Sequence, residues 1–458
     1  MRAIAEGAYA NLDLPARLLR AHLHGRDAAF VTELVYGATR MRGLYDLIIA
    51  RCAGRELSAI DAGVLDVLRL GAHQVLGMRV PGHAAVAESV ALARQAHGGG
   101  AGGFVNAVLR RVSEKDRDQW LGILTRDQDP IGAAAIEHSH PEWVVRALRS
   151  ALRGHGSADA ADIDAQLTAL LAANNTPARV SLVARPGLAS LDELADAGAS
   201  PTGLSAYGAT LRAGGDPAQI PAVRDGRAAV QDEGSQLIAI ALATADPTPR
   251  TTAALHDETA WLDLCAGPGG KAALLACLAA PLGVSLYAND RSEHRSDLVA
   301  ATVAAAVEHG ASVLIGTGDG REVGTQEPGR YDRILVDAPC TGLGALRRRP
   351  EARWRRQPSD LPALTGLQRE LLSSALAAVQ PGGLVGYATC SPHLAETRFL
   401  VEDVLRAHPG VEAIDAQPLF VDAHGKPIGQ LGAPPFVQLW PHLHGTDAMF
   451  FALLRRTE

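Results

Sequence analysis

The sequence predicts a multidomain protein with an all-helical N-terminal domain, a small α+β insert and a C-terminal α/β domain. Three observations support this prediction. Apolar residues recur at helical spacing through about the first 115 residues. Short apolar runs alternate with helical stretches from residue 260 onward, which is typical of a mostly parallel sheet. The stretch Trp261–Lys271 contains the first such run and then a glycine loop that leads into a helix, as in the first unit of a doubly wound nucleotide-binding sheet.

Composition limits the possible classes of protein. The chain has 458 residues, 47% of them hydrophobic, which is enough for two or three domains with separate cores. We find no signal peptide and no run that is apolar enough to span a bilayer. The net charge of −7 means that contacts with a nucleic acid require local basic patches. The five cysteines are scattered and lack metal-ligand spacing, so we expect free thiols, no metal site and a cytoplasmic location.

Residues 1–115 are expected to form a compact helical bundle. Three of its segments, Phe30–Gly37, Ala84–Val90 and Phe104–Arg110, resemble the NusB family, an RNA-binding bundle known from antitermination factors. The resemblance implies a NusB-like RNA-binding domain. A structural cap or a protein-binding module remains the alternative.

The next two parts of the chain are less informative. Residues 116–165 are predicted to be a helical linker. Residues 166–225 are predicted to be the small α+β insert, because the stretch Arg179–Ala184 alternates like a strand and short turns follow it.

Residues 226–458 are predicted to form the α/β domain. A helix follows Gln231, and Asp232 or Ser235 is expected to cap it. The stretches Phe436–Trp440 and Met449–Leu454 are expected to form a closing antiparallel pair. The predicted parallel strands begin at Ala260, Ser285, Val313, Arg333 and Leu384.

Carboxylates follow three of these strands. Asp290 lies about 20 residues past the glycine loop, where a ribose-binding carboxylate is expected, and Asp319 and Asp337 follow later apolar runs. Because the carboxyl ends of parallel strands meet at one edge, these side chains are predicted to line a ligand crevice. The loop also carries Lys271, one of only three lysines among the 43 basic residues, which suggests a role for its compact ammonium group.

Two cysteines also follow predicted strands. Cys340 lies in the turn Asp-Ala-Pro-Cys-Thr-Gly, and Cys390 lies in the turn Ala-Thr-Cys-Ser-Pro. A lone cysteine is usually a small buried apolar residue, as we expect for Cys52 and Cys277. Two thiols at one ligand-binding edge instead suggest covalent catalysis on an electrophilic ring, such as addition to carbon 6 of a cytosine.

Together with the glycine loop, these two turns resemble the motifs of the S-adenosylmethionine-dependent RNA 5-methylcytosine methyltransferases, and the small insert is similar to their RNA-contacting subdomain. The resemblance implies a Rossmann-like methyltransferase domain. It also implies methylation of carbon 5 of a cytosine, most simply in 16S ribosomal RNA or a small-subunit assembly intermediate. One departure is Gly267, which stands where the family usually has Ala.

The resemblance assigns roles to individual residues. Cys390 is the expected nucleophile, Cys340 is expected to assist breakdown of the adduct, and Asp337 is expected to complete the pocket or contact the ring. Residues expected to bind the cofactor are Cys265, Ala266, Gly267, Pro268, Gly269, Gly270, Lys271, Asp290, Arg295, Asp319 and Asp337.

A basic run interleaved with an aromatic residue follows Cys340. Arginines can contact phosphates and a tryptophan can stack on a base, so this run is predicted to bind RNA. A solvated, charged helix face is the alternative for each residue. The predicted residues are Arg347, Arg348, Arg349, Arg353, Trp354, Arg355 and Arg356.

Two other functions remain possible from the sequence. One is a catalytically idle RNA-binding or ribosome-assembly factor that keeps the fold. The other is a DNA cytosine-C5 methyltransferase, in which Cys340 would be the nucleophile; the second thiol, Cys390, disfavours it. We expect a monomer without membrane association.

Overall fold

A computed structural model describes residues 1–78, 80–156, 159, 162–212, 216–246 and 258–458. The chain divides into two compact units. The first comprises Met1–Ala147, Leu167–Pro177 and Leu346–Arg356. The second comprises Leu148–Gln166, Ala178–Ala345 and Gln357–Glu458. The domain boundaries expected near residues 115, 165 and 225 stay predictions.

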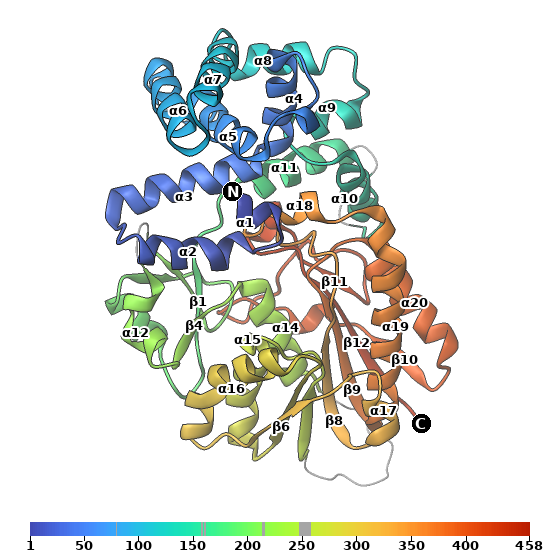
Figure 1. Cartoon of the computed structure of the whole chain (residues 1–458). Helices are drawn as coiled ribbons and strands as arrows, with labels where there is room; N and C mark the ends of the chain where they lie inside the picture. The colour runs from blue at the N-terminus through green and yellow to red at the C-terminus, as the bar shows by residue number, and fades with distance from the viewer. Residues whose placement is uncertain (79, 157–158, 160–161, 213–215, 247–257) are drawn as a thin grey trace. The chain divides into compact units, whose positions relative to one another are not determined.

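The first unit is helical, as the sequence predicts (Figure 1). Its main core joins apolar side chains of α4, α5, α6 and α7, among them Ile48, Leu68 and Leu109, which are fully buried. Asp61 caps α5 by accepting hydrogen bonds from the backbone N–H groups of Gly63 and Val64. The helices are α1 (Arg2–Ala5), α2 (Ala10–Arg20), α3 (Gly25–Arg40), α4 (Arg42–Ala53), α5 (Ala62–Leu76), α6 (Gly82–His97), α7 (Gly99–Val112), α8 (Arg117–Leu124), α9 (Pro130–Glu137) and α18 (Ala352–Arg355). Two more, α10 (Glu142–Gly154) and α11 (Ile163–Asn175), each cross from one unit into the other.

The second unit contains the small α+β insert. Its four strands form an antiparallel sheet in the order β2-β3-β1-β4, and Leu182 and Ala209 lie in the small core beneath it. The elements are β1 (Ser181–Ala184), α12 (Leu191–Asp196), β2 (Ala199–Pro201), β3 (Gly208–Leu211), α13 (Pro221–Arg224) and β4 (Ala228–Val230).

A large mixed sheet forms the rest of this unit. Its strand order is β10-β12-β9-β8-β5-β6-β7, with β11 paired to β12. The five strands from β7 to β9 are parallel, and β12 is antiparallel to both β9 and β10. The strands are β5 (Ala260–Asp263), β6 (Ser285–Asp290), β7 (Val313–Thr317), β8 (Tyr331–Asp337), β9 (Val379–Thr389), β10 (Val411–Ile414), β11 (Val437–Gln438) and β12 (Phe450–Arg456).

Helices cover both faces of the large sheet (Figure 1). The neighbouring residues Trp261 and Leu262 show why: successive side chains of a strand point to opposite faces, and these two belong to different cores. The Trp261 face packs on α14 (Glu233–Thr244), α15 (Gly270–Ala279) and α16 (Glu293–Glu308). The Leu262 face packs on α19 (Leu361–Ala378) and α20 (Arg398–Ala407). The short helices α17 (Val323–Gln326) and α21 (Pro441–His444) complete the unit.

Most of the predicted elements of this domain are present. The five predicted parallel strands are β5 to β9, and the closing antiparallel pair is β11 with β12. Asp232 caps α14 by accepting a hydrogen bond from the Gly234 N–H. Two features differ from the sequence prediction: β10 is an additional strand, and β12 is inserted between β9 and β10.

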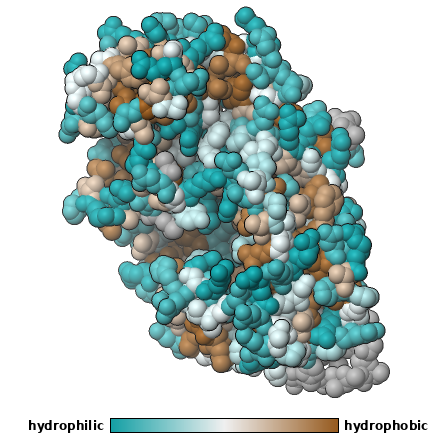
Figure 2. All heavy atoms as spheres, turned by 45° about the vertical axis from the view of Figure 1, so that its right-hand side comes forward, coloured by the Kyte–Doolittle hydropathy of each residue, from teal (hydrophilic) through white to brown (hydrophobic). Residues whose placement is uncertain are grey.

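The surface is mostly hydrophilic on the face that Figure 2 shows, with apolar atoms in scattered patches. Among the described residues, no helix combines the length and the apolar character that crossing a membrane requires.

Candidate active site

The predicted site residues lie at the ends of neighbouring parallel strands. The strands β5, β6 and β8 end at Asp263, Asp290 and Asp337, and β9 ends one residue before Cys390. Asp337 pairs in register with Ala388 of β9, so the turns that carry Cys340 and Cys390 leave the sheet side by side. Topology therefore brings the strand ends with Asp290, Asp337 and Cys390 to one edge, as the sequence predicts, together with Asp263, which was not among the predicted site residues.

The glycine loop connects β5 to α15. Gly269 has a φ of 106°, a left-handed conformation that favours glycine, and it forms the N-cap of α15. At Gly267, a Cβ atom would lie 2.5 Å from Asp290 Oδ2 and 2.6 Å from Arg295 Nε. The departure from Ala at this position therefore lets two predicted cofactor residues approach the loop closely.

Asp290 is held against this loop. Its Oδ2 accepts a hydrogen bond of 3.1 Å from the Gly267 N–H, and its Oδ1 accepts one of 3.0 Å from the Ser292 N–H. Arg295 lies beside them: its Nε is 3.4 Å from Asp290 Oδ2, and its guanidinium donates to the Gly267 carbonyl. The structure brings Asp290 and Arg295 to the loop, and their contacts with cofactor remain predictions.

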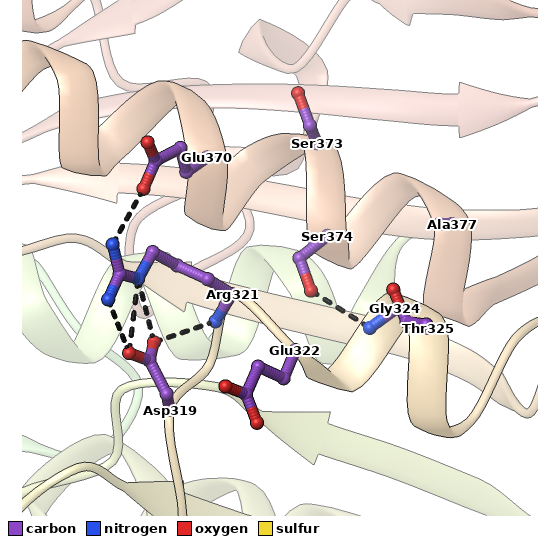
Figure 3. A pocket seen from close by; sticks show the side chains of 9 residues that line it. All are labelled: Asp319, Arg321, Glu322, Gly324, Thr325, Glu370, Ser373, Ser374 and Ala377. Carbon is purple, nitrogen blue, oxygen red and sulfur yellow. Dashed lines mark hydrogen bonds and ion pairs between the residues drawn. The ribbon is translucent and has the colours of Figure 1, made fainter.

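Asp319 follows β7 and forms an ion pair with Arg321, at 2.6 Å between Arg321 Nη2 and Asp319 Oδ2. The hydrogen bonds from Arg321 lower the pKa of Asp319 to about 2. Arg321 also bonds Glu370 of α19, at the mouth of an open hollow of about 500 Å³ between α17 and α19 (Figure 3). Asp319 is the only predicted cofactor residue that lines this hollow, so the hollow is not the predicted crevice.

A buried charge cluster lies at the ends of β5 and β8. Lys271 Nζ is 2.8 Å from Asp337 Oδ2. Burial lowers the pKa of Lys271, but the charge and hydrogen bond of Asp337 outweigh burial and raise it overall. Asp263 is 1% exposed, and within the described residues neither of its carboxylate oxygens has a hydrogen-bond partner. Burial, and then repulsion from Asp337, raise the pKa of Asp263 to about 7.

This cluster fits a cofactor that carries positive charge. Three carboxylates, Asp263, Asp290 and Asp337, surround the glycine loop. Lys271 is paired with Asp337 and Arg295 with Asp290, so the carboxylates outnumber these two cations. A buried carboxylate without partners is costly unless a cation or a donor meets it. A sulfonium compound with an amino-acid end supplies both, so S-adenosylmethionine suits the residues present.

The two thiols meet at the adjoining strand ends. Cys340 Sγ lies 3.4 Å from Cys390 Sγ, and both side chains are half-buried. The hydrogen bond to Cys390, and then burial, raise the pKa of Cys340 well above its usual range. Cys340 is therefore suited to remain a thiol next to a second sulfur. Cys52 and Cys277 are buried, as expected, and burial also raises the pKa of Cys265 in the loop.

The sequence analysis missed one residue at this pair, Glu396. Its side chain is 0% exposed and lies between the two thiol turns. The only signal in the sequence is an acidic residue six positions after Cys390, in a stretch that is otherwise unremarkable.

The basic run belongs to the helical unit, and one prediction in it is wrong. Arg353 is 0% exposed. Its guanidinium donates to the Ser139 carbonyl, the Asn175 side chain and the Asn174 carbonyl, at 2.8 to 3.2 Å. A fully buried group with these partners does not reach a phosphate, so Arg353 is a structural residue.

Several neighbours of Arg353 in the basic run also contact other residues of the helical unit. The Trp354 ring lies against Gly43, where an added Cβ would be 2.4 Å from it. Arg355 donates to the carbonyls of Ile4 and Ala8, and Arg349 and Arg355 both lie over the Tyr9 ring. Arg349 is exposed, and Arg347, Arg348 and Arg356 are half-buried. RNA contacts by these six residues stay predictions.

Comparison with known proteins identifies families for the N-terminal and the C-terminal part of the chain. Residues 250–455 match the family model described as 16S rRNA methyltransferase RsmB/F, and residues 1–114 match the NusB family. A putative methyltransferase of Mycobacterium tuberculosis is 50% identical over 460 residues, covering 100% of this chain and 94% of its own. The probable ribosomal RNA small subunit methyltransferase B of Bacillus subtilis is 30% identical, with 98% and 95% covered. The solved structure of PH0851 has a TM-score of 0.73 at 21% identity, over 93% and 90% of the two chains, and shares the fold.

Fold and site together define an S-adenosylmethionine-dependent methyltransferase whose Rossmann-like domain follows a NusB-like bundle. The chain belongs to the RsmB/F family of 16S rRNA methyltransferases. The resemblance found in its sequence motifs is thereby confirmed at the level of the family.

Proposed function

We propose that this protein methylates carbon 5 of a cytosine in 16S ribosomal RNA, with Cys390 as the nucleophile. The observation that carries the proposal is the pair of thiols 3.4 Å apart at the strand ends that adjoin Lys271 and Asp337. Relatives named ribosomal RNA small subunit methyltransferase B support the choice of RNA.

Different residues of the site bind different parts of the cofactor. The loop Cys265–Lys271 and Asp263 hold the charged methionine end, Asp290 the ribose, and Asp319 the adenine side. Arg295 keeps Asp290 and the loop together. When bound, S-adenosylmethionine supplies an electrophilic methyl group.

The thiols perform the covalent steps. The Cys390 thiolate adds to carbon 6 of the cytosine, which breaks the ring's aromaticity and makes carbon 5 nucleophilic. Carbon 5 then takes up the methyl group from the sulfonium sulfur, which leaves a neutral thioether. The carbon 5 proton passes to solvent, and the bond between carbon 6 and the Cys390 sulfur breaks to regenerate the thiolate. Cys340, whose raised pKa keeps it protonated, donates a hydrogen bond to the Cys390 sulfur and assists its departure. Asp337 orients the cytosine or the cofactor through the oxygen that Lys271 does not bind.

The substrate must present its base outside a stack. A cytosine in a stacked helix hides carbon 6, so a loop of folded RNA or of an assembling small subunit is the expected target. We expect a monomer to act on it.

A denaturing gel tests the assignment of the thiols. Each variant, Cys340→Ala and Cys390→Ala, is incubated with S-adenosylmethionine and 16S RNA. We expect Cys340→Ala to accumulate a protein–RNA adduct, and Cys390→Ala to form none and to lose methyl transfer by at least about 10³-fold.

Each other outcome has a definite meaning. An adduct with Cys390→Ala alone would reverse the two roles. Transfer to DNA at the rate of RNA would contradict the choice of substrate. An inactive wild type that still binds S-adenosylmethionine would favour an RNA-binding assembly factor.

A further inference from the structure

A buried carboxylate joins the two turns that carry the thiols. Glu396 lies just before α20, in the second unit, and is 0% exposed. Its Oε1 accepts a hydrogen bond of 2.8 Å from the Thr341 N–H. Its Oε2 accepts one of 2.6 Å from the Ser391 hydroxyl and another from the Thr341 hydroxyl. One side chain therefore binds both turns.

The two turn residues that Glu396 contacts are next to the thiols in the sequence. Thr341 directly follows Cys340, and Ser391 directly follows Cys390. The hydroxyl oxygens of Thr341 and Ser391 are also 3.0 Å apart. The two turns are 50 residues apart in sequence, and Glu396 is bonded to the residue after each thiol. One carboxylate thus joins the residues that directly follow the two thiols.

Further buried groups hold Glu396 itself in place. Gln368 of α19 donates to Glu396 Oε1 at 3.2 Å and to the carbonyl of Pro339, the residue before Cys340, at 2.8 Å. The Tyr387 hydroxyl donates to the Glu396 carbonyl at 2.8 Å. Gln368 and Tyr387 are both 0% exposed. A rotation of the carboxylate would leave several buried groups without partners, so its orientation is fixed.

We infer that Glu396 is a positioning residue that sets the distance and direction of Cys340 toward Cys390. The effect of this positioning on catalysis rests on the proposed function, which gives the two thiols their roles. Glu396 holds the two turns through Thr341 and Ser391, the residues that follow the thiols. Burial of an acidic side chain is costly, and charge-assisted hydrogen bonds from three donors of the two turns offset that cost.

The pairing of the two thiols can be measured without RNA. Diamide takes two electrons and two protons from two thiols that can approach each other, which yields one disulfide and a hydrazine. The rate of loss of free Cys340 and Cys390 thiols in the full chain therefore reports how well the turns are aligned. Binding of S-adenosylmethionine checks the neighbouring cofactor site, and transfer to 16S RNA in a single turnover reports the chemistry.

Removal of the carboxylate should misalign the thiols. For Glu396→Ala we expect the disulfide to form about tenfold more slowly and single-turnover methyl transfer to fall about 10²-fold. The dissociation constant for S-adenosylmethionine should change less than about threefold, because Lys271 and Asp290 do not contact Glu396. Glu396→Gln should lose less than Glu396→Ala, because an amide keeps one oxygen for the Thr341 N–H and the two hydroxyls can turn to accept.

Two kinds of variant control this experiment. Glu402 of α20 forms a half-exposed ion pair with Arg398, so Glu402→Ala should leave all three measurements unchanged. Ser391→Ala and Thr341→Val each remove a single partner of Glu396. Each should slow disulfide formation about threefold, and each should add little when combined with Glu396→Ala. These two variants also decide the question if Glu396→Ala does not fold.

The outcomes separate this inference from the proposed function. Disulfide formation and methyl transfer at the wild-type rates in Glu396→Ala would overturn the positioning role. Fully additive effects of Ser391→Ala and Thr341→Val with Glu396→Ala would overturn it too. Slower disulfide formation in the variants, together with a wild type that does not methylate RNA, would support the positioning role and contradict the proposed function.

Discussion

The thiol edge of the large sheet and the basic run Arg347–Arg356 are both predicted to be functional, but their residues have different surroundings in the structure. At the edge, the sulfur atoms of Cys340 and Cys390 lie 3.4 Å apart, and both cysteines follow strands next to the ion pair of Lys271 and Asp337. In the basic run, Arg353 is fully buried and bonded to backbone and side-chain oxygens of the helical unit.

The difference shows which kind of sequence signal carries information about position. Parallel strands have a direction, so a residue that follows such a strand is placed at a known edge of the sheet. A run of arginines has no such constraint. Its arginines can lie on a solvated face or, like Arg353, donate hydrogen bonds to buried carbonyl groups inside a helical unit.

The largest effect that separates the two regions is expected at Arg353. Arg353→Met leaves the carbonyls of Ser139 and Asn174 without their donor, which should lower the free energy of unfolding by about 2–4 kcal/mol. Urea unfolding measures the loss, and hydrogen exchange should place it in α9 to α11. The matched control is Arg349→Met, in the same run but exposed, which loses its contact with the Tyr9 ring and should change the urea midpoint much less. Weaker RNA binding by Arg353→Met at an unchanged urea midpoint would restore the rejected phosphate contact.

A smaller, pH-dependent effect is expected at Asp263, on the cofactor side of the edge. Its folded-state pKa of about 7 lies above the usual value of 3.8, so the folded state holds a proton that the unfolded state loses between these two values. Stability therefore falls as pH rises through this window, by on the order of 3 kcal/mol between about pH 5 and pH 7, and the cost persists above it.

Asp263→Asn should remove this slope. Urea unfolding of both proteins at pH 5 and at pH 7.5 tests it without cofactor. We expect the two stabilities to be closer at pH 5, where the folded-state acid is neutral like the amide, and the advantage of the variant to grow at pH 7.5. Parallel pH dependence of the two proteins would show that Asp263 titrates normally.

Much of the α/β domain could be predicted because its elements are local. Each parallel strand, such as Ser285–Asp290, is a short apolar run ending in a polar residue, and the glycine loop is one continuous stretch. The short strand β10 and the insertion of β12 beside it depend on pairing between distant segments, which no local pattern records.

The same limit applies within the site. Cys340 and Cys390 were predicted from the strands that they follow. Glu396 was not, because its role depends on bonds to Thr341, 55 residues away, and to Gln368, 28 residues away. Burial of Arg353 likewise depends on partners more than 170 residues distant in the chain.

The smallest expected effect is at Arg349, and it tests whether any of the basic run binds RNA. An exposed arginine that contacts one phosphate releases about one counterion, so Arg349→Ala should weaken RNA binding only a few-fold and reduce the slope of log affinity against log salt by about 1. Fluorescence anisotropy with a labelled 16S RNA fragment at several salt concentrations measures both quantities. Arg126→Ala provides the matched control, an exposed arginine of the same unit outside the run. Equal salt slopes for wild type, Arg349→Ala and Arg126→Ala would mean that Arg349 makes no phosphate contact. Arg349 would then, like Arg353, be a residue of the basic run that does not bind RNA, in contrast to the thiol edge.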